Sequence, residues 1–147
     1  MLKSFLELFT QQVEQQAAST ATLELATAAL MYEVVNADTT IESSEEEQVR
    51  KLLKAHFKID QRELEALMQT GAANAKDAVD LVQFTRVINQ HYSLEERSDI
   101  LHKLWLVAYA DNHLDMHEEH IIRRIADLMH IPHSFYIQSK LNAKESL

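Results

Sequence analysis

Residues 37–46 read ADTTIESSEE, and 73 positions later residues 110–119 read ADNHLDMHEE. Each stretch starts with an Ala-Asp pair, continues through a short segment holding one aliphatic residue, and ends in acidic residues. The correspondence continues on both sides through apolar pairs: Met31 and Leu104, Tyr32 and Trp105, Val34 and Val107, Val49 and Ile122, Leu52 and Ile125. We therefore expect two copies of one helical unit, which together bury apolar faces that neither copy can bury alone.

Capping boxes, in which a cap side chain and a glutamate three residues later satisfy each other's backbone N–H groups, mark the expected helix starts. The candidate pairs are Ser44 with Glu47 (or Ser43 with Glu46), Asp60 with Glu63, Ser93 with Glu96, and Asp115 with Glu118. Together with the helical spacing of apolar residues, they predict eight helices at about 2–17, 20–37, 44–57, 60–69, 77–92, 94–110, 116–130 and 132–144. The segment 71–76 (GAANAK) is the expected flexible connector.

The fold class predicted from these signals is all-α, with no strand. The expected organisation is one compact domain over residues 1–147, holding two pseudo-symmetric repeats at about 20–70 and 93–144. A chain of 147 residues is close to the usual length of a single domain. One Gly and one Pro are also too few for the frequent turns of an all-β protein.

Composition excludes several classes of function. A single glycine cannot build a dinucleotide-binding fingerprint or a P-loop, and the lack of cysteine excludes disulfide scaffolds, thiol catalysis and thiolate metal sites. Fourteen Lys and Arg against 23 Asp and Glu give a formal net charge of −9, which repels nucleic acid and anionic lipid. We expect a cytoplasmic protein with protein partners, no bound nucleic acid and no direct membrane insertion. Formation of homo-oligomers stays open.

At the repeated segment the chain resembles the tellurite-resistance TerB-like family. The family pattern is a helix ending in Ala-Asp, usually then a glycine, then an aliphatic residue and an acidic residue that opens the next helix. The matching residues are Ala110, Asp111, Leu114 and Glu118, repeated by Ala37, Asp38, Ile41 and Glu45. The resemblance covers roughly residues 20–140. It implies a small all-α fold and a link to tellurite and stress-response systems, where such domains act in metal- or membrane-associated assemblies. Thr39 and Asn112 stand where the family often has glycine, and β-branched Thr resists the left-handed turn that Asn tolerates.

Three acidic residues recur at equivalent positions of the two repeats and form the first candidate metal site. They are Asp38, Glu42 and Glu45 in the first repeat, and Asp111, Asp115 and Glu118 in the second. Such oxygen ligands suit Ca²⁺ or Mg²⁺, although the loops lack the glycine and final glutamate of an EF-hand. In the competing interpretation, which the pattern favours, the aspartates form turns and the glutamates cap their own helices.

Histidines near the second loop form a second candidate site. His117 and His120 share one helix face, His113 precedes them, and with Asp111 or Asp115 they could bind Zn²⁺ or Ni²⁺. The first repeat does not share this set, so exposed histidines on a helix flank are the favoured interpretation. The sequence indicates no catalytic constellation. The function it favours is a non-enzymatic TerB-like module acting through protein interaction or metal association. The alternative is a divalent-metal sensor or buffer that uses the acidic loops, and a divalent cation is the sole cofactor implied.

Overall fold

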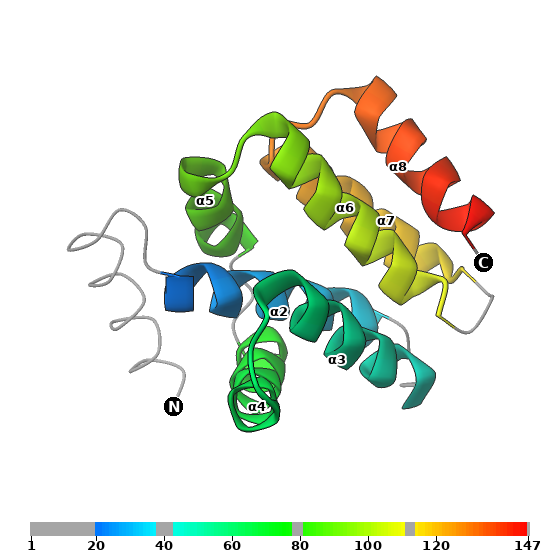
Figure 1. The fold of residues 1–147 in the computed structure, drawn as a ribbon. Coiled ribbons are helices and arrows are strands. Elements are labelled where there is room, and N and C mark those ends of the chain that lie inside the picture. Colours follow the sequence, from blue (N-terminus) through cyan, green and yellow to red (C-terminus); the bar gives the residue numbers. More distant parts are fainter. Residues whose placement is uncertain (1–19, 38–42, 78–80, 111–113, 147) are drawn as a thin grey trace.

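The computed structural model describes residues 20–37, 43–77, 81–110 and 114–146 (Figure 1). This part of the chain forms seven α-helices: α2 (Thr20–Ala37), α3 (Ser43–Phe57), α4 (Gln61–Asp77), α5 (Leu81–His91), α6 (Leu94–Ala108), α7 (Met116–Leu128) and α8 (His133–Glu145). Within those described ranges there is no strand, and the predicted all-α class is confirmed. The helix expected at 2–17 lies outside the described residues.

The seven helices divide into two three-helix units joined by α5. One unit is α2, α3 and α4, and the other is α6, α7 and α8, which lies above the first in Figure 1. Between the units, α2 contacts both α6 and α7, and α6 contacts α3. A twofold relation between the units would interchange the α2–α7 and α6–α3 contacts. Because α3 contacts α4 closely and α7 makes no comparable contact with α8, the repeat read from the sequence stays a prediction.

Three of the expected capping boxes lie at helix starts. Ser93 N donates to Glu96 Oε1 at 2.9 Å, and Glu96 N donates back to Ser93 Oγ at 3.2 Å. The pairs of Asp60 with Glu63 and Asp115 with Glu118 make the same reciprocal arrangement. The side chains of Ser43 and Ser44 lie outside the described part of the chain. The helix starts thus follow from local sequence, because each cap satisfies N–H groups that the helix leaves unpaired.

The expected connector at 71–76 is wrong, because α4 continues through it to Asp77. Three alanines in this segment favour helix, and they outweigh the cost of one glycine. Gly71 is buried where α4 crosses α2, and a Cβ atom at this position would lie 2.9 Å from Ala28 Cβ. Glycine therefore serves close helix packing here and does not provide a hinge.

The core is built around α2 and α6, the two apolar helices that begin the units. Residues at equivalent positions are buried alike: Met31 and Leu104, Val34 and Val107, and Val49 and Ile122 are all fully inaccessible to solvent. Helix α2 contacts every other described helix except α8 closely, which explains why it is apolar around most of its circumference. Side chains from both predicted repeats thus contribute to the core.

Candidate functional site

Two buried glutamates mark the equivalent helix starts of the units. Glu45 is the third residue of α3, Glu118 is the third residue of α7, and both are 0% exposed. Glu118 Oε1 accepts a hydrogen bond from Asp115 N at 3.1 Å, and Asp115 Oδ1 accepts from His117 N at 2.7 Å. Asp115 and Glu118 therefore cap α7, as the structural interpretation of the acidic segment requires.

The metal sites predicted from the sequence fall partly outside the described residues. Asp38, Glu42, Asp111 and His113 lie there. Of the described candidates, His117 and His120 are exposed on α7, whereas Glu45 and Glu118 are buried. Among the side chains that the structure describes, no three of His, Cys, Asp or Glu gather closely enough to hold a metal ion. The loop metal sites therefore stay predictions.

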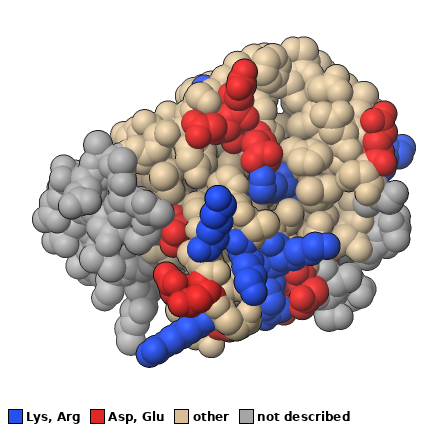
Figure 2. All heavy atoms as spheres, in the orientation of Figure 1, with Lys and Arg blue, Asp and Glu red and all other residues tan. Residues whose placement is uncertain are grey.

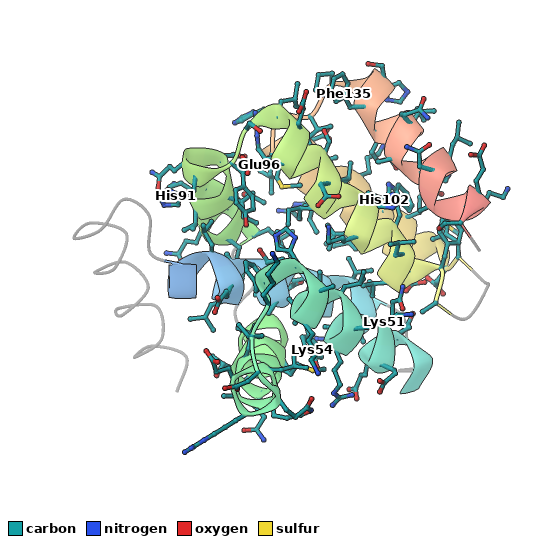
Figure 3. The ribbon with its side chains drawn as sticks, in the orientation of Figure 1. Lys51, Lys54, His91, Glu96, His102 and Phe135 are labelled. Carbon is teal, nitrogen blue, oxygen red and sulfur yellow. The ribbon has the colours of Figure 1, made fainter. Side chains whose placement is uncertain are left out.

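A groove that sequence reasoning missed lies between α6 and α8, with a volume of about 660 Å³. It is lined by Glu95, Ser98, Asp99 and His102 of α6, and by Ser134, Phe135, Gln138, Ser139 and Asn142 of α8. Figure 3 labels His102 and Phe135 on the two helices. On each helix four of these residues recur at positions i, i+3, i+4 and i+7, which form one stripe of a helix surface.

The charged groups of this groove are the carboxylates of Glu95 and Asp99, and no Lys or Arg lines it. Asp99 forms an ion pair with Lys103, and its Oδ2 lies 3.9 Å from His56 Nδ1. Glu95 is exposed, and Phe135 is 39% exposed. The groove is therefore acidic along α6 and offers one aromatic side chain on α8.

Polar side chains of the groove mostly bond locally. Gln138 Nε2 donates to Asn142 Oδ1 at 2.9 Å, and Ser139 Oγ donates to the Tyr136 carbonyl at 2.9 Å. His102 Nδ1 lies 3.4 Å from the carbonyl oxygen of Ser139, so this ring faces main chain rather than a serine hydroxyl. Ser98 Oγ is shielded from solvent and has no hydrogen-bond partner.

A polar contact joins α3 to the start of α6. His56 Nε2 lies 3.2 Å from the Tyr92 hydroxyl oxygen. Burial, followed by the nearby Lys103 ammonium, lowers the pKa of His56, and burial also raises the pKa of Tyr92. Both shifts favour the neutral forms, and this neutral contact ties α3 to the connection between α5 and α6.

Glu33, which is partly buried on α2, is a further group whose pKa is shifted. It lies on α2, its Oε1 atom is buried without a hydrogen-bond partner, and burial raises its pKa to about 7. A carboxyl group in such a position is partly protonated at neutral pH. Its effect falls on stability, because it lies on the central helix of the core.

The described fold and groove define a class of protein: an all-helical module with an acidic groove between α6 and α8. A family model described as "Tellurite resistance protein TerB" matches residues 24–141. The chain therefore belongs to the TerB family, as the Ala-Asp segments indicated. No curated protein and no solved structure matches it significantly. None of the described helices is both long and apolar enough to cross a membrane.

Proposed function

We propose that this TerB-family chain is a non-enzymatic interaction module of a cytoplasmic tellurite or stress-response system. The observation that carries the proposal is the separation of charge on one face (Figure 2). Acidic side chains gather over the N-terminal half of α6, and most basic ones on this face gather over α3 and α4, with acidic ones among them. Separated charge of this kind steers and orients protein partners.

The residues of these two areas are exposed. The acidic area includes Glu95, Glu96 and Asp99, and the basic area includes Lys51 and Lys54. Figure 3 labels both lysines. The chain has a formal net charge of −9, so exposed lysines on one helix give that helix a charge opposite to that of the whole chain.

Growth on tellurite tests this function. Deleting the gene should lower the tellurite concentration that the organism tolerates, and the wild-type chain supplied in trans should restore it. A deletion strain that grows like the parent over the whole tellurite range would contradict the proposal.

A divalent-cation sensor or buffer is the second candidate function. Glu45 and Glu118 favour it, because two fully buried carboxylates at equivalent positions adjoin the acidic segments at 38–42 and 111–115. A nearby cation would offset the cost of burying these charges. The predicted ligands are the six acidic residues Asp38, Glu42, Glu45, Asp111, Asp115 and Glu118, with His113, His117 and His120 as a weaker set.

Thermal melting separates this candidate from simple capping. At about 100 times its dissociation constant, a cation that binds the folded state adds roughly 2.7 kcal/mol of stability. Ca²⁺, Mg²⁺, Zn²⁺ or Ni²⁺ should therefore raise the melting temperature, a chelator should reverse the rise, and Asp111→Asn should abolish it with helical content intact. Equal melting temperatures with every cation and with chelator would contradict the metal function.

A further inference from the structure

We propose that the groove between α6 and α8 binds an extended, arginine-containing segment of a partner protein. This inference rests on the proposed interaction function and names the chemistry of the partner.

The shape comes from two polar stripes on helices that also share a core. Below the groove, α6 and α8 pack through Trp105 and Tyr136, whose ring centroids are 5.5 Å apart. The groove itself is lined by the polar residues Glu95, Asp99, Gln138 and Asn142. Two helices packed tightly along their whole length would have apolar residues at such positions. A volume of about 660 Å³ thus remains open, within the usual range for ligand sites of 300–1,000 Å³.

The spacing of the acidic groups matches an extended chain. Glu95 and Asp99 are four residues apart on α6, which separates them by about 6 Å along the helix axis. Alternate residues of an extended peptide lie on the same face, about 6.6 Å apart. Two cationic side chains separated by one residue can therefore reach both carboxylates at once, the one at Asp99 in exchange for its ion pair with Lys103.

Arginine fits the groove better than lysine does. A guanidinium group can bind a carboxylate through two hydrogen bonds and can also stack on an aromatic ring. Phe135, 39% exposed on the α8 side, supplies such a ring opposite the carboxylates of Glu95 and Asp99. An anionic ligand would instead meet two carboxylates and no Lys or Arg.

The α8 side offers groups that match a peptide backbone. Gln138 and Asn142 now bond to each other, and each carboxamide holds both a donor and an acceptor. They can exchange this mutual hydrogen bond for bonds to the N–H and C=O groups of an extended segment.

Titration with short peptides, followed by ¹⁵N NMR of the full chain, tests the inference. The probe is an acetylated, amidated peptide of sequence Gly-Ala-Arg-Ala-Arg-Ala-Gly. The comparison peptides replace both arginines by glutamate or place them side by side, where their side chains point to opposite faces. We expect saturable shifts in residues 95–102 and 135–142 with the alternating peptide, and binding about tenfold weaker or absent with the other two.

Matched variants identify the contacts. Glu95→Lys should weaken binding by at least about tenfold, since it replaces an attraction by a repulsion. Glu46→Lys makes the same charge change at an exposed position of α3 and should alter binding less than about twofold. Gln138→Trp, at an exposed position of α8, should block the groove, and circular dichroism confirms that each variant keeps its helices.

Three results would overturn the inference. They are a lack of shifts in both stripes, equal weakening by Glu95→Lys and Glu46→Lys, and spermidine shifting the same residues with higher affinity than the alternating peptide. The first two remove the groove as a binding site, and the third assigns it to a small polyamine. Because none of these measurements involves tellurite, the outcome is independent of the growth experiment that tests the proposed function.

Discussion

Glu45 and Glu118 lie 73 positions apart, occupy the third position of α3 and α7, and are both fully buried. Each follows an apolar-cored neighbour in the chain, since α3 comes after α2 and α7 comes after α6 (Figure 1). A buried carboxylate at a helix start is favoured by the helix dipole and by backbone N–H groups, as the bond from Asp115 N to Glu118 shows. Positions paired by the predicted repeat are thus buried alike in polar as well as in apolar residues.

Glu118→Ala should destabilise the fold by about 1–3 kcal/mol, because it leaves the Asp115 N–H without its acceptor and opens space in the interior. Glu45→Ala should cost a similar amount, since the equivalent position is equally buried. Urea unfolding measures both. The exposed Glu46→Ala variant should stay within about 0.5 kcal/mol of the wild type. If the Glu45→Ala and Glu118→Ala variants lose as little free energy of unfolding as Glu46→Ala, the two buried carboxylates do not stabilise the fold as proposed.

Gly71→Ala should destabilise the fold by about 1–2 kcal/mol, although alanine is the better helix former. The added Cβ would lie 2.9 Å from Ala28 Cβ, and the cost of overpacking outweighs the gain in helix propensity. Combining it with Ala28→Gly removes the clashing atom. A double-mutant cycle should therefore give a favourable coupling of about 1 kcal/mol between the two positions. A Gly71→Ala variant more stable than the wild type would contradict the close-packing role of this glycine.

Glu33 should make stability fall as pH rises. Its pKa is about 7 in the folded chain against an ordinary value of 4.5, so between these values the folded state binds more protons than the unfolded state. The full contribution is present below pH 4.5 and is lost as pH rises through 7. Glu33→Gln, which does not titrate, should exceed the wild type in stability by about 1–2 kcal/mol at pH 8 and lose this advantage near pH 5.

Denaturant unfolding of both proteins at pH 5, 6, 7 and 8 measures this difference. The exposed Glu46→Gln variant controls for removing one carboxylate. A Glu33→Gln advantage that is the same at pH 5 and pH 8 would show that burial of the charge is not its cause.

Local signals in the sequence predicted the helix starts, because a capping pair such as Ser93 and Glu96 acts within four residues. The extent of α4 was missed for the opposite reason. Gly71 looks like a breaker by local propensity, and its role becomes visible only when Ala28 of α2 is packed against it. Whether Gly71 interrupts α4 or allows it to pack against α2 depends on a contact with a residue 43 positions away in the chain.

The α6–α8 groove could not be predicted from either helix alone. Glu95 and Asp99 look like an ordinary solvated stripe of α6, and Gln138 and Asn142 look the same on α8. The groove forms because Trp105 and Tyr136 hold the two helices together beneath these stripes. The sequence signal that could have indicated the groove is a stripe of polar residues at i, i+3, i+4 and i+7 on each of two helices whose other faces are apolar.

Growth of the deletion strain on tellurite, complemented with Glu95→Lys or with the matched Glu46→Lys, tests most directly whether this chain acts through its acidic groove. Both variants change the charge by the same amount at an exposed glutamate, and only Glu95 lines the groove. The account predicts that Glu46→Lys restores growth to the wild-type level and that Glu95→Lys leaves the strain as sensitive as the deletion. Full restoration by Glu95→Lys, with the protein present at wild-type abundance, would contradict it.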